Sequence, residues 1–172
     1  MKQLYQDIYT KLGWYGDATQ GFCPGVRFIP YYEHHLMSPI IDLGCGRGHT
    51  VRKLREKWFD AYGIDFIDLN NEMEVGDITL PLDMKKYNTA LCIDVFEHLD
   101  DNQVRQVLLN MSQTQRQVIS VTNNSSKHLG KELHINIKSF DTWAYFISEY
   151  LNIKTIVPIK EFTMLFLCEK KL

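Results

Sequence analysis

The sequence predicts one α/β domain whose core is an open, three-layer sheet of mostly parallel strands. From residue 38 onward, short apolar runs alternate with helical patterns, and this alternation favours parallel pairing through right-handed crossovers. Near the end of the chain, two β-rich runs at 153–158 and 162–168 predict a hairpin, so we expect one antiparallel strand at an edge of the sheet. A chain of 172 residues has room for one such domain and its core.

Two segments come before the predicted sheet. Residues 2–12 carry Leu4, Ile8 and Leu12 at a spacing of four and predict a short amphipathic helix. Residues 13–37 contain glycines and prolines that break regular structure. We expect an irregular lid there, packed on the first helix of the sheet or over a binding site, where aromatic rings would form apolar walls. The aromatic residues of the segment are Trp14, Tyr15, Phe22, Phe28, Tyr31 and Tyr32, and we expect Trp14, Tyr15, Phe22 and Tyr31 to form the walls.

The alternating region predicts its elements in a regular order. Apolar runs predict strands at 39–43, 61–65, 73–75, 89–95 and 117–121, and apolar stripes predict helices at 49–58, 102–112 and 140–151. The stretch between Asp65 and Thr89 is short, and Pro81 interrupts it. We therefore expect loops there in place of one or two helices.

Composition and charge exclude several classes of protein. The chain has 19 Lys and Arg against 21 Asp and Glu, a net charge of −2, which excludes a strongly basic nucleic-acid-binding protein. No apolar run is long enough to cross a bilayer, and the N-terminus lacks the apolar core of a signal peptide, so we expect a cytoplasmic protein without a membrane partner. We expect free thiols and no metal site, because no CxxC motif is formed by Cys23, Cys45, Cys92 and Cys168.

A glycine-rich turn, Asp42-Leu43-Gly44-Cys45-Gly46-Arg47-Gly48, joins the first predicted strand to the first predicted helix. Such glycines allow positive φ and close approach of a ligand to the backbone. Ligands of open α/β sheets bind at this edge, beside the point where the strand order reverses. A tight turn without a ligand is the alternative interpretation. The dinucleotide-binding fingerprint requires Gly or Ala where His49 stands, which argues against a nicotinamide-dependent oxidoreductase.

The turn resembles the first motif of class I S-adenosylmethionine-dependent methyltransferases, in which an acidic residue is followed by alternating glycines. The resemblance extends over about 38–169 and is strongest in 40–50 and 91–99. It implies a Rossmann-like fold and a methyltransferase that uses S-adenosyl-L-methionine and releases S-adenosyl-L-homocysteine. It also implies one methyltransferase domain over 1–172, with an N-terminal helix and aromatic lid at 1–37 and a cofactor-binding core at 38–172.

Four matched motifs assign the cofactor-binding residues. The resemblance implies that Asp65 accepts hydrogen bonds from both ribose hydroxyls, which suits the two oxygens of a carboxylate. It implies that Asp77 accepts from the adenine amine and that the Ile78 N–H donates to the ring. The stretch Cys92–Leu99 is similar to the fourth motif in its Glu-His-Leu form. The implied contacts are Asp42, Gly44, Cys45, Gly46 and Gly48 in the turn, Asp65, Phe66 on the adenine, Asp77, Ile78, and Asp94 and Val95 along the methionine.

These acidic residues also have structural interpretations. Asp65 and Asp77 could be ordinary turn residues, Asp94 could cap the following helix, and Glu97 could favour the positive end of the helix dipole. The functional interpretation gains weight because the motifs occur in the expected order at the expected strand ends.

Two histidines are candidates for catalysis on the acceptor side. His98 follows the fourth strand, and His134 lies in a segment that should return over the site after the fifth strand. Either side chain could act as a general acid or base. Alternatively, His98 contacts the cofactor or its loop, and His134 positions a loop.

The acceptor is expected to be a small molecule, because the chain carries no appended module for RNA, DNA or protein. The identity of the acceptor and the oligomeric state stay open. Two other functions compete with this one. A non-catalytic S-adenosylmethionine-binding or regulatory protein would have the same cofactor half, and an NAD(P)-dependent oxidoreductase would share the sheet.

Overall fold

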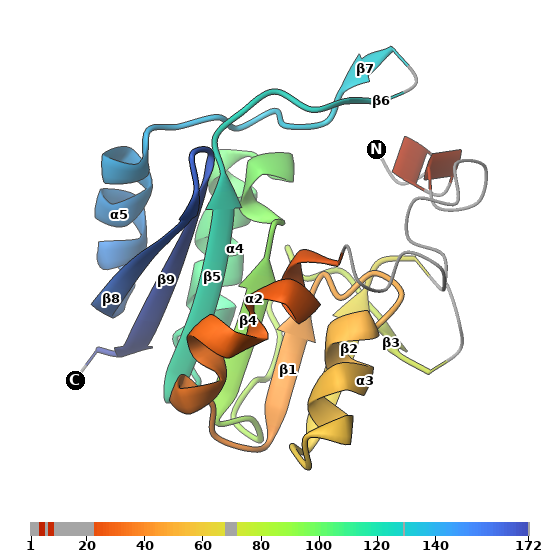
Figure 1. Ribbon diagram of the computed structural model, residues 1–172, viewed down its shortest axis with the longest axis vertical. Helices are drawn as coiled ribbons and strands as arrows, with labels where there is room; N and C mark the ends of the chain where they lie inside the picture. Colours follow the sequence, from red (N-terminus) through yellow and green to blue (C-terminus); the bar gives the residue numbers. More distant parts are fainter. Residues whose placement is uncertain (1–3, 6, 9–22, 68–71, 129, 172) are drawn as a thin grey trace.

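The computed structural model describes residues 4–5, 7–8, 23–67, 72–128 and 130–171 (Figure 1). Residues 4–5 and 7–8 are helical, as predicted. The other residues of the predicted helix and most of the predicted lid, including Trp14, Tyr15 and Phe22, lie outside the described residues. The elements that follow are α2 (Pro24–Tyr32), η2 (Glu33–His35), β1 (Ile40–Leu43), α3 (His49–Glu56), β2 (Ala61–Asp65), β3 (Glu74–Val75), β4 (Thr89–Ile93), η3 (Phe96–His98), α4 (Asp101–Met111), β5 (Arg116–Thr122), β6 (Lys127–His128), β7 (Lys131–Glu132), α5 (Phe140–Ser148), β8 (Leu151–Lys160) and β9 (Thr163–Lys170).

In the described part of the chain, seven strands form one sheet in the order β3-β2-β1-β4-β5-β9-β8, and β6 pairs separately with β7. The pairings from β3 to β5 are parallel, and β9 is antiparallel to both β5 and β8. The predicted open, mostly parallel sheet is confirmed. The predicted C-terminal hairpin with an antiparallel strand is also confirmed, but that strand is β9, one place in from the edge, and not the edge strand itself. The second strand of the hairpin pairs along all of β5, from Arg116 opposite Glu169 to Thr122 opposite Thr163, and leaves β8 outermost.

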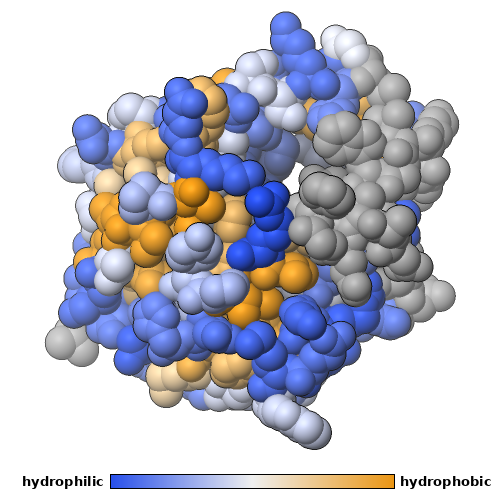
Figure 2. Space-filling view, viewed as in Figure 1, coloured by the Kyte–Doolittle hydropathy of each residue, from blue (hydrophilic) through white to orange (hydrophobic). Residues whose placement is uncertain are grey.

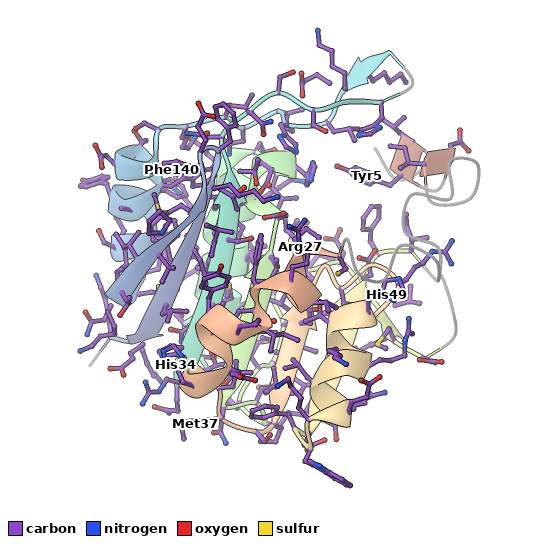
Figure 3. The ribbon with its side chains drawn as sticks, in the orientation of Figure 1. Tyr5, Arg27, His34, Met37, His49 and Phe140 are labelled. Carbon is purple, nitrogen blue, oxygen red and sulfur yellow. The ribbon has the colours of Figure 1, made fainter. Side chains whose placement is uncertain are left out.

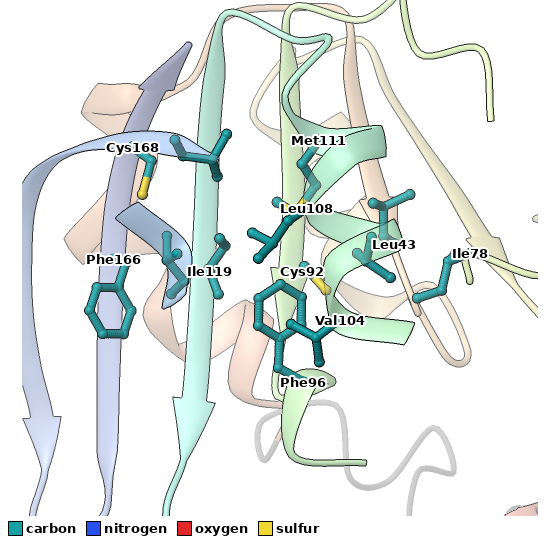
Figure 4. Packing of buried hydrophobic residues seen from close by; sticks show 14 of the residues in the cluster. Leu43, Ile78, Cys92, Phe96, Val104, Leu108, Met111, Ile119, Phe166 and Cys168 are labelled. Atoms are coloured by element: carbon teal, nitrogen blue, oxygen red, sulfur yellow. The ribbon is translucent and has the colours of Figure 1, made fainter. Parts of the chain in front are cut away.

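Side chains of each strand alternate between the two faces of the sheet, and helices cover both faces. On β4, Cys92 points toward α4 and α5 and packs with Leu108, as Figure 4 shows. The neighbouring Leu91 points to the other face and packs with Ile29 of α2 and Val51 of α3. The predicted three layers are therefore present.

Local signals fix where the later helices begin. The Asp100 carboxylate accepts the Asn102 and Gln103 N–H groups at 2.9 and 3.0 Å, and the Asp100 N–H donates to Gln103 Oε1 at 2.9 Å. This reciprocal box caps α4, so the cap considered for Asp94 is provided by Asp100. Ser139 caps α5, which ends at Ser148, three residues before the predicted end. Among the described helices, none has the length and apolar character needed to cross a membrane.

Residues 24–35 form a helix and a 3₁₀ turn, where the sequence predicted an irregular segment. Pro24 stands in the first turn of α2, where a missing N–H costs nothing, and Phe28, Ile29 and Tyr32 form a buried stripe on the sheet. Gly25 lies where α2 meets α3, because a Cβ there would stand 2.1 Å from Thr50 Oγ1. The prediction is wrong here because the proline and the glycine serve helix initiation and close packing.

The outer strand of the C-terminal hairpin, β8, is largely uncovered, whereas β9 is mostly buried. Figure 1 shows α2 and α3 in front of the central strands, whereas the hairpin lies beside them. Most of β8 is exposed, including Ile156 at 46%. Figure 2 accordingly shows hydrophobic patches between hydrophilic residues on this face.

The loop between β3 and β4 replaces a helix, as predicted, and side-chain amides from α4 hold it in place. Asn110 Nδ2 donates to the carbonyls of Ile78 and Leu80 at 3.0 and 2.8 Å, and Asn110 Oδ1 accepts the Leu82 N–H at 3.1 Å. Gln113 bonds the same loop through Leu82 and Met84. The side-chain amides thus satisfy backbone groups that a helix in this loop would have satisfied internally.

Candidate functional site

A cavity of about 780 Å³ lies at the carboxyl ends of the parallel strands. It opens beside β1 and β4, the neighbouring strands at which the strand order reverses. Its wall is formed by residues that follow β1, β2, β3, β4 and β5, together with part of the N-terminal helical segment. The lining residues are Tyr5, Ile8, Gly44, Asp65, Phe66, Val75, Gly76, Asp77, Ile78, Thr79, Asp94, Val95, Glu97, His98, Leu99, Asp100, Gln103, Thr122, Ser126, His128, Leu133, His134 and Ile135.

The glycine turn after β1 lets a ligand approach the backbone closely. Its hydrogen-bond donors are largely used within the protein. The Gly44 and Cys45 N–H groups donate to the Ile64 carbonyl at 2.9 and 3.2 Å, and the Gly48 N–H donates to the Cys45 carbonyl at 2.9 Å. Gly44 has φ +76°, and a Cβ on it would stand 2.8 Å from Val95 Cγ2. Only glycine therefore fits without displacing the wall that Gly44 and Val95 share.

Of the predicted turn contacts, Gly44 lines the cavity, whereas Asp42, Cys45, Gly46 and Gly48 are not among its lining residues. Asp42 is 4% exposed, and burial, together with the nearby Asp65 charge, raises its pKa to about 7. The sequence pattern identified the turn as a unit, but only the fold shows which of these residues, Gly44, lines the cavity.

Asp65, at the end of β2, reaches the cavity and also holds the turn. Its Oδ2 accepts the Gly46 N–H at 2.9 Å, and its Oδ1 accepts the Ile67 N–H at 3.1 Å. Burial raises the pKa of Asp65, and these hydrogen bonds oppose the rise. A carboxylate oxygen can accept more than one hydrogen bond, so both oxygens keep capacity for a ligand. Both interpretations of Asp65, turn residue and ligand acceptor, are therefore compatible with its geometry.

Asp77 and Ile78 form the wall after β3. Asp77 Oδ1 accepts the N–H and the hydroxyl of Thr79 at 2.9 and 2.6 Å, which closes a tight turn. The side chain of Ile78 is buried in the core, and its carbonyl is held by Asn110. Phe66 lies on the same wall, and Tyr5 contacts it edge-on with ring centroids 5.8 Å apart.

Asp94 follows β4 in an uncommon backbone conformation. It has φ +53°, its N–H donates to Ser120 Oγ at 3.0 Å, and its Oδ1 accepts the Ser120 hydroxyl at 2.5 Å. A non-glycine residue in this region is held there by its surroundings and is typical of functional sites. Burial raises the pKa of Asp94.

Glu97 is a wall residue that the sequence analysis treated only as a dipole partner. It is fully buried, and among the described residues neither carboxylate oxygen has a hydrogen-bond partner. Burial, followed by the neighbouring Asp94 charge, raises the pKa of Glu97 well above its usual value. The apolar pattern around Phe96 did not predict that Glu97 is buried on the cavity wall, because the surroundings of Glu97 come from chain segments distant in sequence.

His98 and His134 come together on the cavity wall, with ring centroids 4.8 Å apart. His98 Nδ1 donates to the Leu133 carbonyl at 3.0 Å, and His134 Nδ1 donates to the Asn124 carbonyl. Burial lowers the pKa of His98 to about 4. His134 therefore faces the cavity, as the catalytic hypothesis requires, and its backbone bond also fixes the loop.

Several wall residues were missed or misplaced by the sequence analysis. Tyr5 points from the N-terminal segment toward the strand ends (Figure 3), and its ring also contacts His98 at 5.6 Å between centroids. The apolar stripe of Leu4, Ile8 and Leu12, which predicted the N-terminal helix, did not single out Tyr5. Tyr31, expected on the wall, is 47% exposed on α2 and does not line the cavity. His34 and His35 lie at the opposite end of the sheet, outside the site.

Comparison with solved structures identifies the same fold in proteins of low sequence identity. The PH0226 protein from Pyrococcus horikoshii OT3 is 14% identical, with a TM-score of 0.74 over 99% of this chain and 100% of that one. An S-adenosylmethionine-dependent methyltransferase from Clostridium acetobutylicum ATCC 824 is 10% identical, with a TM-score of 0.67 over 99% of both chains. The glycopeptide N-methyltransferase MtfA, solved with S-adenosylmethionine, is 9% identical, with a TM-score of 0.66 over 86% of this chain and 93% of that one.

Sequence comparison extends this likeness from fold to family. No curated protein matches the sequence. The family model for the methyltransferase domain matches residues 17–160, which is most of the chain and includes every strand from β1 to β8. The chain therefore belongs to the methyltransferase domain family, as the resemblance of its glycine turn to the class I enzymes predicts.

Proposed function

We propose that the protein transfers a methyl group from S-adenosyl-L-methionine to a small-molecule acceptor by in-line displacement, releasing S-adenosyl-L-homocysteine. One observation carries the proposal. Asp65, the Asp77–Ile78 turn and Asp94 follow three different strands, and all line one cavity with the Gly44 turn. This is the set that the sequence motifs assign to the ribose, the adenine and the methionine.

The residues of the cavity fit this cofactor. Asp65 keeps acceptor capacity for ribose hydroxyls, and the absence of a side chain on Gly44 leaves room beside Val95. Phe66 offers an apolar face, and Asp77 keeps one carboxylate oxygen outside its turn. When bound, the sulfonium of the cofactor supplies an activated methyl group. The protein's own task is to hold an acceptor in line with it and to exclude competing water.

The acceptor side of the cavity is assigned to His98 and His134. A volume of about 780 Å³ is within the range of small-molecule sites, roughly 300–1,000 Å³, and supports an acceptor of modest size. His134 is partly exposed and borders the cavity. Its imidazole can therefore contact an acceptor or accept a proton that the acceptor releases. His98 is buried deeper and packs against Tyr5, which supports a positioning role.

A ligand screen tests the cofactor assignment. S-adenosylmethionine and S-adenosylhomocysteine should raise the melting temperature, because a ligand at a hundredfold excess over its Kd stabilises the folded state by about 2.7 kcal/mol. NAD should have little effect, since His49 replaces the small residue of the dinucleotide fingerprint. Stabilisation by NAD without stabilisation by S-adenosylhomocysteine would overturn the proposal.

A further inference from the structure

Glu97, His98 and His134 form a cluster of metal-type donors. One carboxylate oxygen of Glu97 and one ring nitrogen of each histidine all lie within 4.8 Å of one another. Glu97 and His98 come from the 3₁₀ turn η3 after β4, whereas His134 comes from the segment after β7. The three residues also line the same wall of the cavity.

Glu97 supplies a second, independent observation. It is fully buried, and both carboxylate oxygens lack hydrogen-bond partners in the described part of the chain. A buried carboxylate without partners is costly, and natural proteins satisfy such groups with hydrogen bonds, ion pairs or bound cations. Glu97 is among the residues that line the cavity, so a cation held there would lie beside this carboxylate.

Hydrogen bonds to backbone carbonyls hold both histidines in the way that ligating histidines are held in metalloproteins. A backbone carbonyl only accepts hydrogen bonds, so Nδ1 of His98 must carry its proton toward Leu133, and Nδ1 of His134 must carry its proton toward Asn124. The lone pair of each neutral ring is then on Nε2. Such carbonyl partners fix the tautomer and the orientation of ligating histidines in metalloproteins.

We propose that Glu97, His98 and His134 bind one divalent transition-metal ion. Two imidazoles and one carboxylate favour zinc, manganese, iron or cobalt over magnesium and calcium, which prefer oxygen ligands alone. Three protein ligands leave coordination positions open toward the cavity. Resting on the proposed function, we further infer that an oxygen donor of the acceptor, a hydroxyl or a carboxylate, occupies an open position and is thereby aligned for methylation.

Metal titration of the full chain tests the site directly. After removal of metals with a chelator, Zn²⁺ and Co²⁺ should each bind with one-to-one stoichiometry in calorimetry, and Co²⁺ should show visible absorption of a protein-bound ion. His134→Asn and Glu97→Gln should each weaken binding at least about 100-fold, because even partners of metal ligands contribute 10- to 100-fold. The matched control is His34→Asn, an exposed histidine at the far end of the sheet, which should leave the affinity unchanged.

Two further measurements keep the outcome clear. Thermal unfolding of the metal-free variants shows whether each is folded; His134→Asn is the safer variant because His134 is partly exposed. Catechol, a probe with two adjacent hydroxyls, should bind the Zn²⁺-loaded protein and not the metal-free protein. No metal binding by the wild type, or equal binding by folded His134→Asn, overturns the metal site. Metal binding without any S-adenosylhomocysteine binding overturns the proposed function and leaves the site standing.

Discussion

Asp65 links the glycine turn to the cavity before any ligand is present. Its two oxygens accept the N–H groups of Gly46 and Ile67, so the side chain ties the end of β1 to the end of β2. Under the proposed function, the same oxygens also accept the ribose hydroxyls. Removing the carboxylate should therefore affect both the turn and the ligand.

Asp65→Ala should weaken S-adenosylhomocysteine binding by about 2–4 kcal/mol, because hydrogen bonds to a charged group contribute about 1.5–3 kcal/mol each and are not additive. It should also lower the free energy of unfolding by about 1–3 kcal/mol, since two backbone N–H groups lose their acceptor. Calorimetry measures the first effect, and urea denaturation measures the second.

The control for this variant is Asp83→Ala, an exposed turn residue that accepts the Lys85 N–H. It should leave ligand affinity unchanged. If folded Asp65→Ala bound S-adenosylhomocysteine as tightly as the wild type, Asp65 would be a turn residue only.

At the scale of elements, α4 supports a loop that has no helix of its own. Asn110 is 1% exposed and bonds three backbone groups of the segment 78–82. Because Ile78 begins this segment and also lines the cavity, a side chain on a helix behind the sheet fixes part of the candidate site. Under the proposed function, we therefore expect one amide to couple stability to ligand binding.

Asn110→Ala should lower the free energy of unfolding by about 3 kcal/mol or more, because each buried backbone group left without a partner costs about 1–3 kcal/mol. It should also weaken S-adenosylhomocysteine binding, since the Asp77–Ile78 turn loses its anchor. Urea denaturation and calorimetry provide the two readouts. Asn102→Ala, on the exposed side of the same helix, should change both quantities little; an equal loss in the two variants would argue against the anchor.

At the scale of the whole molecule, buried carboxyl groups gather around the strand ends. Burial raises the pKa of Asp42, Asp65, Asp94 and Glu97. A carboxyl group whose pKa is raised in the folded state binds its proton more tightly there than in the unfolded chain. The free energy of unfolding therefore falls as pH rises between the two pKa values. His98, with a pKa lowered to about 4, acts in the opposite direction as pH falls below its unfolded value.

Asp42→Asn isolates one of these contributions. The pKa of Asp42 rises from 3.8 to about 7, so its penalty is absent below the lower value and complete above the higher one. The variant should gain stability relative to the wild type as pH rises through this window, by up to about 1.4 kcal/mol for each unit of pKa. Urea denaturation at about pH 5 and about pH 8 measures the difference, which should grow with pH. A constant difference would contradict the assignment.

Periodicity and spacing along the chain determined the alternating strands and helices and the C-terminal hairpin. These features depend on neighbouring residues, as in the strand ending at Asp42 and the stripe Val104, Val107 and Leu108. The resemblance to class I methyltransferases assigned Asp65, Asp77 and Asp94 to one ligand, and all three line one cavity. Each follows a parallel strand, and parallel strands end at a common edge.

Only the tertiary structure decided which residues meet across long separations in sequence. The place of β9 inside the sheet depends on its pairing with β5, and the helix α2 depends on burial of Phe28 and Ile29 against the sheet. The cluster of Glu97 and His98 with His134 joins segments whose spacing has no local periodicity. The local hydrophobic pattern of the sequence shows which surface each element buries. Long-range contacts depend on how those surfaces pack together. This packing created the chemical environment of the site.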